Sequence, residues 1–126
     1  PLIRLVNIDY DGDGDVEEGI SGEIGTMVEA LYASMQAYAA TTAGMPIHYD
    51  TARYPYFFAD ANGNNAVDEG EGAYNAWTPT LLRAAYNFQV VAKDPGAFAH
   101  NGRYVMQFLY DSIEALGGDV TAMTRP

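Results

Sequence analysis

The chain has 126 residues, is 48% hydrophobic and 13% aromatic, and contains no cysteine, so we expect a single domain over residues 1–126 without disulfides, thiolate metal sites or a cysteine nucleophile. Its formal net charge is -11, and most of its 17 acidic residues lie in the windows Asp9–Glu23 and Asp60–Glu71, neither of which contains a Lys or Arg. This balance excludes nucleic acid as a partner, and the lack of a long apolar run excludes direct membrane insertion by this segment.

The first acidic window has the spacing of a calcium-binding loop of the EF-hand type. Such a loop binds calcium through oxygen ligands at positions 1, 3, 5, 7, 9 and 12, and a glycine at position 6 makes the sharp turn. Counted from Asp9, Gly14 occupies position 6 and Val16 the apolar position 8. The predicted ligands at the first five ligand positions are Asp9, Asp11, Asp13, Asp15 (through its backbone carbonyl) and Glu17.

The last ligand of this first loop stays open. Position 12 is Ile20, where a bidentate Glu is expected. Glu23 lies one helical turn later and would supply the missing carboxylate in a longer loop, and we favour this frame. A loop that starts at Asn7 instead has Glu18 at position 12, but it has Gly14 at the apolar position 8. An Asp- and Gly-rich surface turn is the simpler alternative, although it does not explain the strict alternate spacing of the acids.

Residues 21–40, which follow the first loop, are predicted to form an amphipathic helix capped by Ser21. Its apolar face would consist of Ile24, Met27, Val28, Leu31, Met35 and Tyr38, which recur at helical spacing. The segments that enter the two loops are weaker helix candidates. Only eight residues precede Asp9, and Pro55 interrupts the segment before Asp60.

The second acidic window has a complete set of calcium ligands at the same spacing. Position 6 is Asn65, and asparagine is among the non-glycine residues that best tolerate a left-handed backbone. Both loops have Val at position 8 and an acidic pair followed by Gly at positions 9–11, so we expect the chain to bind two calcium ions. The predicted ligands of the second loop are Asp60, Asn62, Asn64, Ala66 (through its backbone carbonyl), Asp68 and Glu71.

Two further helices are predicted in the C-terminal half. Thr78 followed by Pro79 is a strong helix start, with an apolar face of Leu81, Leu82, Ala85, Phe88 and Val91 and a stop near residues 94–96. The third helix would run from about Asn101 to Leu116, with an apolar face of Val105, Phe108, Leu109, Ser112, Ile113 and Leu116, and end at Gly117. The sequence therefore predicts an all-α fold, an EF-hand-like pair of calcium loops with three main amphipathic helices.

Three stretches of the C-terminal half resemble the C-terminal part of bacterial multihaem c-type cytochromes: residues 81–94 (LLRAAYNFQVVAKD), 95–101 (PGAFAHN) and 104–116 (YVMQFLYDSIEAL). In that family an acidic Asp/Gly run and a D-x-N-G-N loop precede these stretches, and the resemblance extends from Asn7 to Leu116. It implies an exported protein, periplasmic, outer-membrane-associated or extracellular, that takes part in electron transfer. This segment has no C-x-x-C-H motif and so holds no covalent haem.

The expected function is therefore a calcium-binding structural module, appended to the haem-bearing part of the same parent chain. The start at Pro1 rather than Met fits a domain cut from a longer protein. A calcium-dependent protein-binding module of the dockerin or adhesion type is the alternative, but the two loops lie farther apart than in a dockerin. No nucleophile–base pair, phosphate loop or histidine metal set indicates an enzyme. His100 is expected to make local hydrogen bonds, and contact with a haem of the parent stays open.

Overall fold

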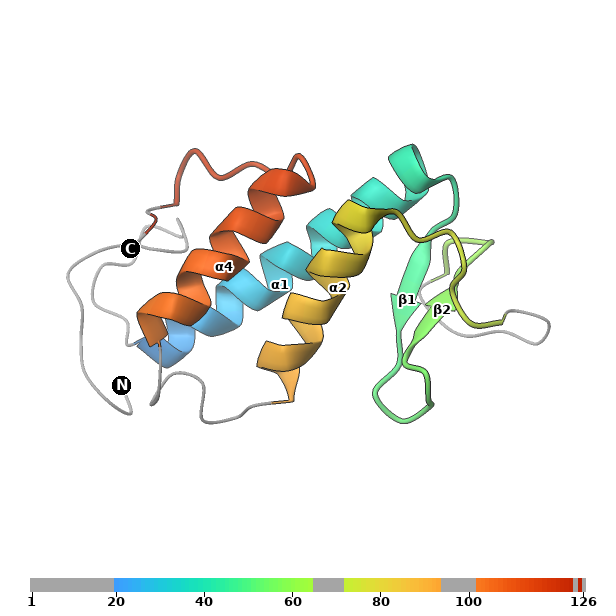
Figure 1. Ribbon diagram of the computed structural model, residues 1–126, viewed down its shortest axis with the longest axis horizontal. Helices are drawn as coiled ribbons and strands as arrows, with labels where there is room; N and C mark the ends of the chain where they lie inside the picture. Colours follow the sequence, from blue (N-terminus) through green and yellow to red (C-terminus); the bar gives the residue numbers. More distant parts are fainter. Residues whose placement is uncertain (1–19, 65–71, 94–101, 124, 126) are drawn as a thin grey trace.

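The computed structural model describes residues 20–64, 72–93, 102–123 and 125. Within these residues, three α-helices lie side by side and a short two-stranded sheet packs at one end of them (Figure 1). The elements are α1 (Ile20–Tyr38), its π-helical continuation η1 (Ala39–Ala43), β1 (Ile47–Tyr49), β2 (Phe57–Ala59), α2 (Pro79–Ala92) and α4 (Gly102–Ala115).

The prediction of an all-α fold is wrong, because the described chain is mixed α/β. Strands β1 and β2 pair antiparallel, with Ile47 opposite Ala59 and Tyr49 opposite Phe57. Aromatic and β-branched side chains favour this pleated arrangement, and Pro55 prevents the preceding segment from becoming the entering helix that an EF-hand requires. That segment instead forms the hairpin turn, in which the Asp50 carboxylate accepts a 2.9 Å hydrogen bond from the backbone N–H of Ala52.

Helix α1 supplies the central part of the core. Its predicted apolar face is confirmed by the burial of Ile24, Met27, Leu31 and Met35. The helix begins at Ile20, so Ser21 lies inside it and the prediction that Ser21 caps it is wrong.

The start of α2 is confirmed where the sequence predicted it. The Thr78 hydroxyl oxygen accepts a 3.1 Å hydrogen bond from the N–H of Leu81, and Pro79 occupies the first turn, where its missing N–H costs nothing. The prediction that Leu82 belongs to the apolar face is wrong, since its side chain is 55% exposed. Leu81, Ala85, Phe88 and Val91 are buried, and Leu82 points about 100° away from Leu81 around the helix.

Helix α4 is also confirmed, and its last turn closes as expected. The residue after Leu116 is Gly117, with a φ of 82°, a left-handed conformation that favours glycine. The N–H of Gly118 then donates a 2.9 Å hydrogen bond to the carbonyl of Ile113. Met106, which is not part of the predicted apolar face, is also fully buried.

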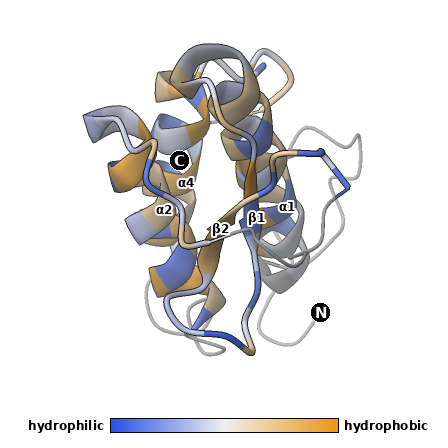
Figure 2. Cartoon of the chain, turned by 90° about the vertical axis from the view of Figure 1, so that its right-hand side faces the viewer, coloured by the Kyte–Doolittle hydropathy of each residue, from blue (hydrophilic) through white to orange (hydrophobic). Residues whose placement is uncertain are grey.

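The sheet is fixed to the helices through tyrosines. Viewed from the sheet end, β1 and β2 lie in front of the helices (Figure 2). The hydroxyl of Tyr32 on α1 accepts a 3.1 Å hydrogen bond from the N–H of Tyr49. The Tyr49 ring lies 4.9 Å from Phe57 of β2 and 4.9 Å from Phe88 of α2, measured between centroids. The sheet and the helices thus share one aromatic core, which holds the start of the second acidic loop in place.

Candidate functional site

The base of the second predicted calcium loop is a pair of hydrogen-bonded chain segments. Strand β2 ends at Ala59, whose N–H donates a 3.0 Å hydrogen bond to the carbonyl of Gly72. The N–H of Tyr74 donates one of 2.9 Å to the carbonyl of Phe57, and Phe58 and Ala73 form a β-bridge. The chain therefore leaves β2 at position 1 of the loop and returns along β2 directly after position 12.

The predicted EF-hand arrangement, helix–loop–helix, is wrong for the second loop. An EF-hand loop joins two helices, whereas the loop from Asp60 follows a strand and returns to it. The predicted pairing of the two loops is also unsupported by the described residues. Glu23 lies in the first turn of α1, while β1 contacts α1 at Tyr32, nine residues later and about 13 Å along the helix axis. Figure 1 places β2 and the start of α1 at opposite ends of the molecule.

Asp60, the predicted first ligand, is a buried carboxylate. Its side chain is 3% exposed, and its N–H donates a 2.9 Å hydrogen bond to the carbonyl of Pro46. Burial and, to a smaller degree, the charge of Asp60 raise the pKa of Tyr32, while a hydrogen bond from Tyr49 opposes the shift. Acidic side chains are rarely buried to this extent, so Asp60 differs from an ordinary acidic residue of a surface turn.

The chain turns sharply after Asp60. The N–H of Gly63 donates a 3.0 Å hydrogen bond to the Asp60 carbonyl, and Gly63 has a φ of 68°. The side-chain oxygen of Asn62 accepts a 3.2 Å hydrogen bond from the N–H of Asn64. Asn62 and Asn64 are exposed. The remaining predicted ligands of this loop, Ala66, Asp68 and Glu71, lie outside the described residues.

Glu23, the favoured last ligand of the first loop, is fully buried. Its place in the first turn of α1 is favourable for a carboxylate, because backbone N–H groups there carry partial positive charge. The other acids of that loop lie outside the described residues, as does the alternative ligand Glu18 and the histidine His100. Those acids are Asp9, Asp11, Asp13, Asp15 and Glu17. Within the described ranges, no group of three or more His, Cys, Asp or Glu side chains forms a metal-binding cluster.

Tyrosine hydroxyls hold the hairpin that carries Asp60. The Tyr74 hydroxyl donates a 2.6 Å hydrogen bond to the carbonyl of Met45, which precedes β1. Burial raises the pKa of Tyr74, and the nearby Tyr38 raises it further, so the hydroxyl keeps its proton as a donor. No local pattern in the sequence indicates that the Tyr74 hydroxyl reaches the carbonyl of Met45.

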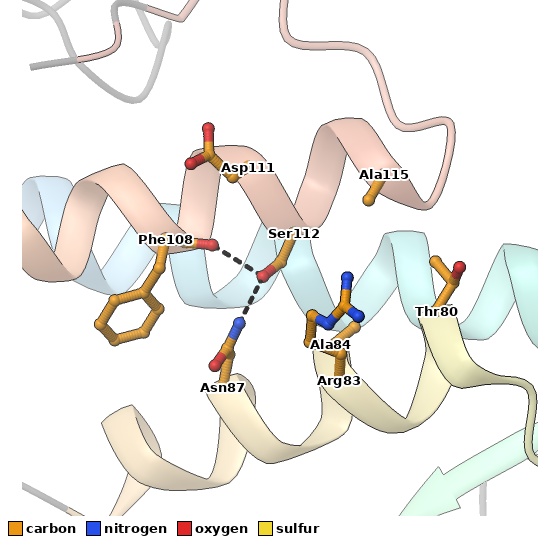
Figure 3. A pocket seen from close by; sticks show the side chains of 8 residues that line it. All are labelled: Thr80, Arg83, Ala84, Asn87, Phe108, Asp111, Ser112 and Ala115. Atoms are coloured by element: carbon orange, nitrogen blue, oxygen red, sulfur yellow. Dashed lines mark hydrogen bonds between the residues drawn. The ribbon is translucent and has the colours of Figure 1, made fainter.

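A pocket of about 260 Å³ lies between α2 and α4 (Figure 3). The Asn87 amide donates a 2.9 Å hydrogen bond to the Ser112 hydroxyl, which donates one of 2.7 Å to the carbonyl of Phe108. The proton of Ser112 is therefore committed to the backbone, and the lining offers no histidine as a base. The lining residues are Thr80, Arg83, Ala84, Asn87, Phe108, Asp111, Ser112 and Ala115.

The chain is similar to segments of polyheme cytochromes of Geobacter sulfurreducens. It is 35% identical over 111 residues to the C-type polyheme cytochrome OmcB and 34% identical over 122 residues to the C-type polyheme cytochrome OmcC, which covers 75% and 83% of this chain. It spans only 15% of the length of these relatives. No family model matches the chain, and no solved structure does. The chain is therefore related to one region of polyheme cytochromes.

Proposed function

We propose that this chain is a calcium-stabilised structural module of a longer, exported multihaem electron-transfer protein. Its relationship to a region of polyheme cytochromes supports such a parent chain. The sequence has no cysteine, which covalent c-type haem attachment requires, so in this proposal the module contributes structure rather than a haem of its own. None of the helices in the described residues is long and apolar enough to cross a membrane.

The observation that carries the calcium proposal is the burial of Asp60 at the mouth of a closed loop. The hydrogen bond between Ala59 and Gly72 fixes both ends of a segment whose sequence supplies oxygen ligands at alternate positions. A hard cation that takes six to eight oxygens would use the Asp60 carboxylate as its first ligand, and calcium tolerates irregular loops better than magnesium does.

The donor chemistry of both acidic windows fits calcium. In the second loop Asp60, Asn62 and Asn64 would supply side-chain oxygens, Ala66 its carbonyl, and Asp68 and Glu71 carboxylates. In the first loop the acids from Asp9 to Glu17 would bind a second ion, with the buried Glu23 as the last ligand. Calcium would bind the folded chain preferentially, so its binding free energy appears as stability.

Titration calorimetry on chelator-stripped protein tests this proposal. We expect two binding events, and Glu71→Gln should remove one of them because the amide cannot act as a bidentate anionic ligand. Glu114→Gln is the matched control, since Glu114 is exposed on α4 outside both windows and its loss should leave both events unchanged. The events should persist in excess magnesium.

A lack of calcium binding would contradict the proposal. If millimolar calcium releases no heat and does not raise the melting temperature, the two windows are acidic surface turns and the calcium proposal fails. The relationship to polyheme cytochromes would stand, and the module would have to be stabilised by its core and by its parent chain alone.

A further inference from the structure

The outward face of α2 carries a stripe of exposed apolar side chains. Leu82, Tyr86 and Val90 are 55%, 68% and 44% exposed, and their spacing of four residues places them in one row. They make up three of the five large hydrophobic residues that the described chain leaves exposed. Single exposed apolar residues need no explanation, but a contiguous row on one helix marks an interaction surface.

The charge of this face differs from that of the rest of the chain. Helix α2 contains no acidic residue, and its charged positions are Arg83 and the C-terminal cap Lys93, both exposed. The whole chain, by contrast, has a net charge of -11. A surface that is apolar at its centre and basic at its border fits a partner that is apolar and bordered by carboxylates.

The row continues beyond α2 onto the hairpin turn. The Lys93 ammonium lies 4.1 Å from the centroid of the Tyr56 ring, and the Tyr56 ring lies 5.7 Å from that of Tyr54, which is 84% exposed. We call the surface formed by Tyr54, Leu82, Arg83, Tyr86, Val90 and Lys93 the α2 face. Its aromatic and arginine content is typical of protein interfaces.

We propose that the α2 face docks onto the haem-bearing part of the same polypeptide, against the exposed edge of a haem. The apolar part of the macrocycle would pack on Leu82, Tyr86 and Val90. Its propionate carboxylates, which leave one edge of the ring, would pair with a basic residue at one end of the row, either Arg83 or Lys93. This inference rests on the proposed function, because the chain spans only 15% of its polyheme relatives. A second copy of this chain is a poorer occupant, since two chains of charge -11 repel each other.

Two tyrosines of almost equal exposure make a matched test. Tyr86 on the α2 face is 68% exposed, and Tyr104 on α4, outside that face, is 66% exposed. Hydroxyl-radical footprinting is carried out on the 126-residue chain and on the intact haem-loaded polypeptide that contains it. We expect the labelling of Tyr86 and Tyr54 to fall several-fold in the intact polypeptide, while that of Tyr104 stays the same. Tyr86→Ser with Val90→Ser should restore the labelling of Tyr54, because the change removes two of the three exposed apolar side chains of the row.

Each other outcome overturns the inference and separates it from the proposed function. If the intact polypeptide contains haem but Tyr86 and Tyr104 are labelled equally in both samples, the docking is wrong and the proposed function stands. Protection of Tyr86 that appears in the 126-residue chain alone and grows with its concentration identifies a second copy as the occupant. If the intact polypeptide contains no covalent haem by its pyridine haemochrome spectrum, the proposed function itself fails.

Discussion

The N–H of Ala59 donates a 3.0 Å hydrogen bond to the carbonyl of Gly72, and this bond joins the two ends of a twelve-residue acidic loop. Bringing the two ends of a flexible loop together costs conformational entropy, and a loop with free ends would lose this entropy when it binds an ion. Because pairing with β2 already holds the two ends together in the folded chain, part of this entropy is lost on folding rather than on ion binding. The loop is thus preorganised at its ends by strand pairing rather than by flanking helices.

The stability of the chain should depend on calcium through Asp60. At a calcium concentration about 100-fold above the dissociation constant, one bound ion adds about 2.7 kcal/mol, or roughly 10 °C in Tm for a chain of this size. Asp60→Asn should lose most of this gain. In chelator the same variant should differ from the parent by much less than it does in calcium, because the calcium-dependent part of the stability is then absent from both. Asp50→Asn, in the exposed hairpin turn, is the control and should change Tm equally with and without calcium. Thermal melts of the parent and both variants, in calcium and in chelator, measure these differences.

The adjacent residues Leu81 and Leu82 provide a sharp test of the packing of α2. Leu81 is fully buried and Leu82 is 55% exposed. Leu81→Ala should lower the free energy of unfolding by about 2–5 kcal/mol, because it removes apolar contacts and leaves a cavity. Leu82→Ala should cost less than about 1 kcal/mol. Urea denaturation measures both, and similar losses for the two variants would contradict the orientation of α2.

Thr78 links the start of α2 to the end of α1. Its hydroxyl oxygen caps Leu81, and it lies 2.9 Å from the hydroxyl of Tyr38. Thr78→Ala should lower the free energy of unfolding by about 1–2 kcal/mol, since it removes the cap and one hydrogen bond of Tyr38. Thr51→Ala, in the exposed hairpin turn, is the control and should stay within about 0.5 kcal/mol of the parent. Tyr38→Phe keeps the cap and should cost less than Thr78→Ala.

The ion pair between Asp111 and Arg125 should give a small, pH-dependent contribution to stability. The two side chains are 2.9 Å apart and about half exposed, and the Arg125 guanidinium lowers the pKa of Asp111 below its usual 3.8. A lowered pKa stabilises the fold at pH values above the usual one, and this contribution is lost as the pH falls through the lowered value. Asp111→Asn should therefore be slightly destabilising at pH 7, less so than Thr78→Ala, and indistinguishable from the parent at a pH below the lowered pKa of Asp111. High salt should also remove the difference.

Local patterns in the sequence were sufficient for the three helices. The apolar residues of α1, from Ile24 to Met35, repeat every three or four positions, and Thr78 with Pro79 is a start signal that acts through neighbouring backbone groups. Gly117 ends α4 for an equally local reason, its left-handed backbone. The acidic spacing that predicts calcium loops is likewise visible without a structure.

Only the tertiary structure decided the sheet and the position of the loop that follows it. Each strand has three residues, too few for a periodic pattern, and pairing of Ile47 with Ala59 depends on contacts between distant segments. The burial of Asp60 and Glu23, and the exposure of Leu82, depend on what packs against each side chain. The sequence by itself determined which residues form helices and where acidic oxygens gather, because these follow from neighbouring residues. Only the fold determined that the second acidic loop begins and ends beside strand β2, because strand pairing joins residues that are far apart in the chain.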